Sequence, residues 1–188
     1  MLFTTEGGLL AAGSRVTETA PGQLRASGKL LRCDSEFVGV HVGENGRRLV
    51  AIRPIPRGTR VFALIGREHP APTKYSVQVG PELHLDQDCA RDEFELVRKY
   101  FWRYLDHHCE PTVFIRDREV IATRDISEGE GVTFDYNTTE YDMASPFDCE
   151  CGSERCVGTV RGARHLSDDQ LARVEHVLPE WLRADVRG

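Results

Sequence analysis

The C-terminal part of the chain carries three cysteines within eight residues, Cys149, Cys151 and Cys156. A secreted disulfide scaffold would be shorter and would space its cysteines more widely, so clustered thiols are better explained as metal ligands. Zinc prefers four ligands in a tetrahedron and readily accepts thiolates. The cluster therefore predicts a zinc site that takes one more ligand from elsewhere in the chain.

The fourth ligand is expected from the middle of the chain. Cys109 is the best candidate, because it lies in a predicted turn beside His107 and His108. Either histidine is the alternative. Ligation by Cys109 would tie the tail to mid-chain, and structural zinc supplies on the order of 10 kcal/mol in small modules. It would also remove the free thiolate that a Cys–His nucleophile pair, the rival interpretation, requires.

Short strand-like runs separated by turn residues fill the chain from Leu30 onward. The turn Glu44–Gly46 lies between two such runs and predicts a hairpin. The predicted strands cover residues 37–42, 48–52, 61–65, 75–79, 82–85, 112–116, 120–123 and 132–136. This close spacing predicts a mainly β domain of antiparallel strands.

Two stretches have helical character. The first covers residues 94–105, with apolar residues near one face at Phe94, Val97, Phe101 and Leu105. The second begins at the capping box Ser167–Gln170 and stops near Pro179. Its body-facing residues are predicted to be Leu171, Val174 and Leu178.

Composition sets further limits. A chain of 188 residues suits one compact domain, and residues 1–28, rich in Gly, Ala, Thr and Ser, are predicted to be loosely ordered. The net charge of −6 argues against broad binding to nucleic acid and suits a basic partner, or simple solubility. With no membrane-length apolar run and no secretory signal, we expect a cytoplasmic protein, or a nuclear one in a eukaryote.

Several segments in a fixed order resemble one known family. They are Asn45–Ala51 with Arg53–Gly58, Arg103–Thr112, Gly129–Tyr136 and Cys149–Cys156. They resemble the motifs KGRGLFA, RFINHSCDPN, GEELTFDY and CxCGSxxC of the SET-domain protein-lysine methyltransferases, the last being the post-SET zinc motif. The resemblance covers roughly residues 37–160.

The resemblance implies a mainly β SET fold of several small antiparallel sheets with few short helices. In that fold the strand carrying Phe134–Tyr136 passes under a preceding loop as a pseudoknot. The implied division is an N-terminal extension (1–30), a SET domain (31–136), a post-SET zinc-binding segment (137–162) and a C-terminal helix (163–188).

The resemblance also implies residue roles. Tyr136 corresponds to the catalytic tyrosine, which orients the substrate amine. Phe134 corresponds to a channel position where Phe, unlike Tyr, leaves room for di- or trimethylation. On sequence pattern alone, each could instead be a core residue of its strand.

The implied cofactor is S-adenosylmethionine. The residues that would bind it are Gly46, Arg47, Tyr75, Arg103, Asp106, His107 and Tyr136, with His107 acting mainly through its backbone. Tyr75 could equally serve packing, and Arg103 an ion pair.

The match departs from the family at several positions. Asp106 replaces Asn, His108 replaces Ser, Arg48 replaces the second Gly and Thr112 replaces Asn. Asp106 can accept a hydrogen bond from the methionine ammonium but, as a carboxylate, cannot donate one.

The sequence therefore predicts an S-adenosylmethionine-dependent protein-lysine methyltransferase with one structural zinc ion. Its substrate would be a lysine-bearing, basic protein or peptide, and neither nucleic acid nor membrane is an expected partner. Two alternatives remain: a catalytically weak SET-like protein that binds a peptide or partner, and a methyltransferase acting on a non-protein amine or another side chain.

Overall fold

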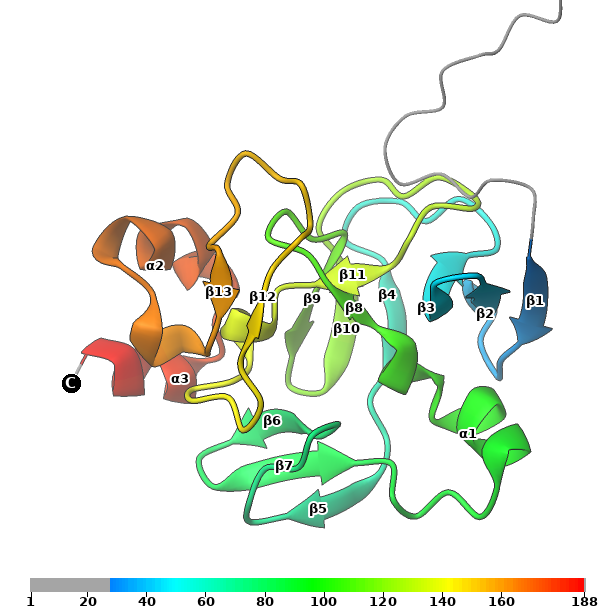
Figure 1. Ribbon diagram of the computed structural model, residues 1–188, viewed down its shortest axis with the longest axis horizontal. Helices are drawn as coiled ribbons and strands as arrows, with labels where there is room; N and C mark the ends of the chain where they lie inside the picture. The colour runs from blue at the N-terminus through cyan, green and yellow to red at the C-terminus, as the bar shows by residue number, and fades with distance from the viewer. Residues whose placement is uncertain (1–27, 188) are drawn as a thin grey trace, which may run out of the picture.

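The computed structural model describes residues 28–187, which form five small β-sheets connected by loops and short helices (Figure 1). The strand orders are β1-β2-β3, β4-β10-β9, β5-β7-β6, β8-β11 and β12-β13. The bounds are β1 (Lys29–Arg32), β2 (Val38–Gly43), β3 (Gly46–Ala51), β4 (Arg60–Ala63), β5 (Arg67–His69), β6 (Val77–Gly80), β7 (Leu83–Asp86), β8 (Asp106–His107), β9 (Val113–Arg116), β10 (Glu119–Ala122), β11 (Thr133–Phe134), β12 (Phe147–Asp148) and β13 (Thr159–Val160). The predicted mainly β fold class is confirmed.

Most neighbouring strands pair antiparallel, but β8 and β11 pair in parallel, with Thr133 opposite Asp106 and Phe134 opposite His107. The contact continues beyond the strands, because the backbone N–H of Thr112 donates to the carbonyl oxygen of Thr133. The segment that carries Phe134 therefore lies along the earlier loop at residues 105–112. The pseudoknot was expected to place the strand carrying Phe134–Tyr136 under a preceding loop, without specifying which loop.

The predicted strand at residues 132–136 is shorter than expected. It ends at Phe134, and Tyr136–Thr138 forms the 3-10 helix η2. Asp135 causes the change, because its side chain accepts a hydrogen bond from the backbone N–H of Asn137. Such a local cap turns the backbone away from an extended conformation.

The predicted helix at residues 94–105 is divided in two. The α-helix α1 (Glu93–Lys99) ends at Tyr100, and the 3-10 helix η1 (Phe101–Tyr104) follows. Burial explains the break: Phe101 and Trp102 are consecutive yet both lie in the core, and the indole N–H of Trp102 donates to the carbonyl oxygen of Ile65 at 2.9 Å. Phe94, expected on the buried face, is 71% exposed.

The C-terminal region contains more than the one predicted helix. The capping box at Ser167 is confirmed, and α2 (Asp168–Val174) begins there. The chain continues as η4 (Glu175–Val177) and, after Pro179, as the unpredicted helix α3 (Glu180–Arg187). A further short 3-10 helix, η3 (Ala163–His165), precedes them.

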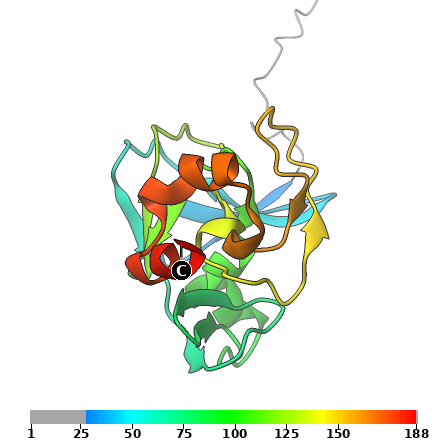
Figure 2. The same cartoon turned by 90° about the vertical axis from the view of Figure 1, so that its left-hand side faces the viewer.

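These helices pack at one end of the molecule, where Figure 2 shows α2 and α3 facing the viewer. Leu178 and Leu182 form a small second core there with Ala163.

The main core joins the N-terminal sheet to the central strands. Its fully buried members include Val38, Val40, Val113 and Val120, each with 0% exposure. The segment after Gly129 closes this core, because Val132 donates its backbone N–H to the carbonyl oxygen of Leu49 on β3.

None of the helices described in residues 28–187 is both long and apolar enough to span a membrane. The predicted extension at residues 1–30 lies almost wholly outside the described residues, and the domain division stays a prediction.

Candidate active site and metal centre

The four cysteines singled out in the sequence meet in space. Ligand sulfurs of Cys109, Cys149, Cys151 and Cys156 all lie within 4.8 Å of one another. The sulfurs of Cys109 and Cys149 are 3.9 Å apart, close to the roughly 3.8 Å between two sulfurs of a zinc tetrahedron with Zn–S bonds of about 2.3 Å. The cluster is compatible with one zinc ion. Its fourth member is Cys109, not His107 or His108.

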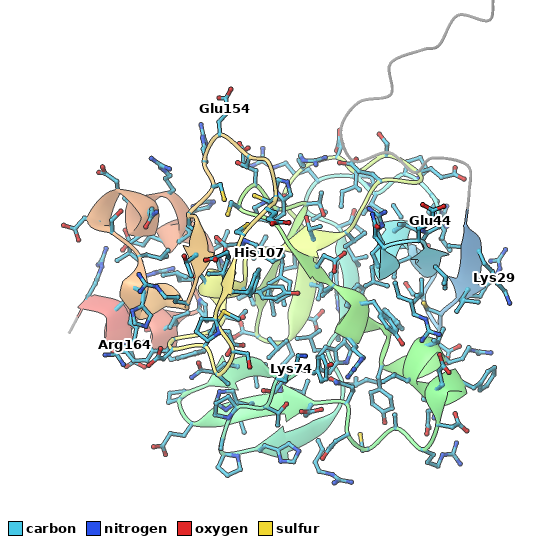
Figure 3. The ribbon with its side chains drawn as sticks, viewed as in Figure 1. Lys29, Glu44, Lys74, His107, Glu154 and Arg164 are labelled. Carbon is cyan, nitrogen blue, oxygen red and sulfur yellow. The ribbon has the colours of Figure 1, made fainter. Side chains whose placement is uncertain are left out.

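His107 connects the cysteine cluster to Tyr136. Its side chain is only 3% exposed, and Figure 3 shows it near the middle of the molecule. The ring Nδ1 accepts a hydrogen bond from the backbone N–H of Tyr136 at 3.3 Å, while Nε2 lies 3.3 Å from the sulfur of Cys109. Burial, with a smaller contribution from His108, lowers the pKa of His107 to about 4. The imidazole ring of His107 is therefore neutral near pH 7, and it connects the cysteine cluster to Tyr136.

Tyr136 is half-buried, with its hydroxyl turned toward the loop before Asp106. The hydroxyl donates to the carbonyl oxygen of Leu105 at 2.7 Å. Burial raises the pKa of Tyr136 well above its ordinary value, and the negative charges of Asp106 and Glu140 raise it further. The phenol therefore stays protonated near neutral pH. It can donate and accept hydrogen bonds but cannot act as a phenolate base.

Tyr136 and Leu105 both line a small cavity of about 90 Å³. Aromatic and apolar residues, Trp102, Leu105, Phe134 and Tyr136, contribute to its lining. The rings of Phe134 and Tyr136 are 4.6 Å apart, and Phe134 is 4% exposed. The aromatic part of the lining suits an alkyl amine chain, whose cationic end would be attracted to aromatic faces, and Lys74, Arg103 and Glu140 add charged groups to it.

The predicted cofactor residues near the N-terminal sheet lie around a glycine turn. Gly46 has φ of +101°, and a Cβ built there would meet no atom within 4 Å, so the turn borders open space. Arg47 donates to the hydroxyl of Tyr104 at 3.3 Å and forms an ion pair with Glu93.

Asp106 lies at the surface between the turn and Tyr136. Desolvation raises the pKa of its carboxyl group, and the nearby charge of Arg48 opposes that rise. The carboxylate of Asp106, the guanidinium group of the nearby Arg48 and the open turn at Gly46 provide both hydrogen-bond acceptors and donors. Such a set fits the zwitterionic end of an amino acid.

Tyr75 and Arg103 form a stacked pair. The guanidinium carbon of Arg103 lies 3.7 Å from the centroid of the Tyr75 ring. Both residues line the same cavity as Tyr136. From the sequence, packing was an alternative role for Tyr75, and an ion pair was an alternative role for Arg103. In the structure the two side chains stack on each other.

Three contributors to the site were missed in the sequence. The carbonyl group of Leu105 carries no side-chain signal. Phe147 on β12 packs edge-to-face on His107, with ring centroids 5.8 Å apart, but its position before Cys149 was not interpreted. Glu140, a buried carboxylic acid in the wall of the cavity, lies between the motifs Gly129–Tyr136 and Cys149–Cys156 and matches no sequence pattern.

Comparisons with known proteins identify the family of the chain. The SET-domain family matches residues 46–137. The methyltransferase flvH of Aspergillus flavus is 34% identical over 149 residues, covering 76% of this chain and 72% of that protein. A histone-lysine N-methyltransferase of Candida albicans, H3 lysine-36 specific, is 37% identical over 98 residues, but the match covers 43% of this chain and only 12% of that protein.

The fold also matches solved structures. The crystal structure of KRYPTONITE in complex with mCHG DNA and SAH has a TM-score of 0.52 and 22% identity, covering 66% of this chain and 29% of that one. The chain belongs to the SET-domain family of methyltransferases. Its fold and the small sheets around Tyr136 are those of that family.

Proposed function

We propose that the chain transfers a methyl group from S-adenosylmethionine to the side-chain amine of lysine in a protein or peptide. One observation carries the proposal: Tyr136 and Leu105, whose hydroxyl and carbonyl oxygens are 2.7 Å apart, both line a cavity with aromatic side chains in its wall. An amine placed there could donate hydrogen bonds to both oxygens and direct its lone pair away from them. The names of relatives that act on histone lysine support the choice of lysine.

The nucleophile must be the neutral amine. Lysine has a pKa of about 10.4, so neutralising it at pH 7.4 costs about 4 kcal/mol. A narrow apolar channel lowers this cost because it disfavours the ammonium form. Phe134 and Trp102 contribute by excluding water, and Tyr136 with Leu105 fixes the direction of attack.

S-adenosylmethionine, when bound, supplies an electrophilic methyl group on a sulfonium. We assign its contacts to Gly46, Arg47, Tyr75, Arg103, Asp106, Tyr136 and the backbone of His107. Asp106 would accept from the methionine ammonium. Phe134, lacking a hydroxyl group, leaves room for methylated amines, and we infer that di- or trimethyllysine is the product.

The proposed zinc ion has a structural role. Through Cys109 it would join the tail to the loop that carries Leu105 and His107. Because His107 also accepts from the backbone of Tyr136, zinc would stabilise the geometry of the catalytic tyrosine.

Two experiments in sequence test this function. Calorimetry measures binding of S-adenosylmethionine, and transfer of its radiolabelled methyl group is then followed into core histones, other basic proteins and small primary amines. Methyllysine detected by mass spectrometry would support the proposal. Cofactor binding without any transfer would favour the SET-like binding protein, for which Asp106 and Arg48 are the motivating departures.

A methyltransferase of non-protein amines is the second candidate. The relative that aligns over most of both chains is named simply as a methyltransferase, with neither histone nor lysine in its name. Label in a small amine, with none in protein, would establish this candidate and exclude the first.

A further inference from the structure

Glu140 is a buried carboxylic acid beside the proposed transfer point. It is 7% exposed and lines the same cavity as Phe134 and Tyr136. Its backbone N–H donates to the carbonyl oxygen of Tyr136 at 3.0 Å, so the two residues lie on one tight turn. None of the family motifs in the sequence includes this residue.

Neighbouring groups hold the carboxyl group in place. Its Oε1 accepts a hydrogen bond from the backbone N–H of Gln78 on β6 at 2.8 Å. The side chain of Gln78 in turn accepts from the backbone N–H of Tyr141 at 2.9 Å. These bonds position Glu140 between β6 and the segment after η2.

The carboxyl group has no cationic partner among residues 28–187. No lysine, arginine or histidine there forms an ion pair with it, and the backbone N–H of Gln78, bonded to Oε1, is the one donor to its carboxyl group among those residues. Buried charges are normally paired, because an isolated one costs several kcal/mol. A carboxylate in an aromatic-lined cavity without its own cation is suited to a cation that arrives from outside.

The cationic side chains that line the cavity do not pair with the carboxyl group of Glu140. Lys74 and Arg103 line the same cavity. The guanidinium group of Arg103 is stacked on Tyr75, and the amine of Lys74 lies 5.3 Å from the centroid of that ring. Apart from Glu140 and these two cations, the titratable side chains in the lining are those of Tyr75 and Tyr136.

We propose that Glu140 is a further catalytic residue, whose carboxylate binds the substrate ammonium in this cavity and accepts one of its protons before methyl transfer. The proposal rests on the proposed function but applies to any primary amine substrate. Proton transfer turns an ammonium and a carboxylate into a neutral amine and a carboxylic acid. The ion pair is the resting state of the complex, and burial of Glu140 lowers the cost of forming the neutral pair from it. The nitrogen lone pair then forms the bond to the methyl carbon, and the sulfur leaves with the electrons of the carbon–sulfur bond.

The environment of the carboxyl group suits this role. Burial raises its pKa to about 7, although the hydrogen bond from Gln78 opposes the rise. Glu140 is therefore protonated below that pH and charged above it. A group that titrates near neutrality can both receive a proton from the amine and release it to solvent after the product leaves.

Carboxyl NMR of the full chain labelled with ¹³C at glutamate Cδ tests the binding step without a known substrate. The Glu140 signal is assigned by its absence in Glu140→Gln. The probe is n-butylammonium chloride, the end of a lysine side chain, with sodium chloride and n-butanol as controls. We expect butylammonium alone to lower the pKa of Glu140, because a cation favours the carboxylate. An unchanged titration at saturating probe overturns the proposal.

Kinetics test the proton step once an acceptor is found. Glu140→Gln keeps an oxygen that can accept from Gln78, and we expect its kcat/KM at neutral pH to fall about 10²-fold. Wild-type rates should rise through pH 7 and level off, whereas the variant's rates should keep rising toward the pKa of the free amine. A merely structural role would lower the rate without changing this profile.

Asp142→Asn removes an exposed carboxylate paired with Arg164 and His165, and it should retain the wild-type profile. A Glu140→Gln variant with the wild-type rate and pH profile contradicts the proton step. Failure of the proposed function gives a different result, namely no binding of S-adenosylmethionine in calorimetry while the butylammonium effect on Glu140 persists.

Discussion

The hydroxyl of Tyr136 donates a hydrogen bond to the carbonyl oxygen of Leu105, two groups that lie 31 residues apart in sequence and 2.7 Å apart in space. This contact fixes the phenol of Tyr136, a residue of the cavity lining, before any substrate arrives. Pre-alignment of this kind lowers the entropic cost of reaching the geometry for transfer. The contact depends on the parallel pairing of β8 and β11, which brings the two segments together.

Tyr136→Phe should lower turnover by about 10²-fold, the scale expected when one preorganised hydrogen-bonding group is removed. Affinity for S-adenosylmethionine should stay within the experimental error of the wild type, because the ring remains. Single-turnover methyl transfer and calorimetry measure the two quantities. The control Tyr141→Phe alters a half-buried tyrosine outside the cavity. Full turnover in Tyr136→Phe would remove the hydroxyl from its assigned role.

Phe134→Tyr should change the degree of methylation. The added hydroxyl would enter a cavity of about 90 Å³ and take space needed by a methylated amine. Mass spectrometry of the product should show monomethylation in the variant against di- or trimethylation in the wild type. The same product distribution in both proteins would contradict the role of Phe134, and Phe37→Tyr, at a position outside the cavity, controls for the extra hydroxyl.

Cys109→Ser should abolish stoichiometric zinc binding and lower the melting temperature. Loss of one thiolate leaves three ligands, and structural zinc binding is worth on the order of 10 kcal/mol in small modules. Elemental analysis and thermal melting report the two effects. Cys89→Ser, which changes a cysteine outside the cluster, should retain one zinc per chain. Zinc retained by Cys109→Ser would point to His107 as the replacement ligand.

Asp106→Asn should weaken binding of S-adenosylmethionine by about tenfold at pH 7.5, because a charge-assisted hydrogen bond becomes a neutral one. Desolvation raises the pKa of Asp106, so wild-type affinity should fall as pH decreases through that raised pKa and the carboxylate takes a proton. The variant should lack this dependence. Calorimetry over a pH series checks it, with Asp185→Asn on α3 as the exposed control.

Gly162→Ala should destabilise the fold by about 2 kcal/mol. Gly162 has φ of +105°, and an added Cβ would lie 2.6 Å from the carbonyl oxygen of Tyr141. Gly158→Ala is the matched control, because Gly158 has φ of +80° but open space around the added Cβ. Urea denaturation should show the larger loss for Gly162→Ala. Equal losses would mean that backbone strain alone, without the clash, accounts for the effect.

The sequence alone determined which reactive side chains and which family motifs this chain contains. Cys149, Cys151 and Cys156 indicated a metal by spacing, and the hairpin at Glu44–Gly46 followed from turn residues. The four recognised segments, including the one that ends at Tyr136, were sufficient to identify the family. Local signals succeed here because thiolate chemistry, turn conformation and capping each depend on residues close together in the chain.

Tertiary structure decided how these parts meet. Helix α1 stops at Lys99 because Phe101 and Trp102 are both drawn into the core, a demand that helical periodicity does not contain. The carbonyl of Leu105 and the carboxyl group of Glu140 acquire meaning only when long-range pairing places them beside Tyr136. Sequence encodes which groups are present, whereas burial and strand pairing over tens of residues determine which of them share a cavity.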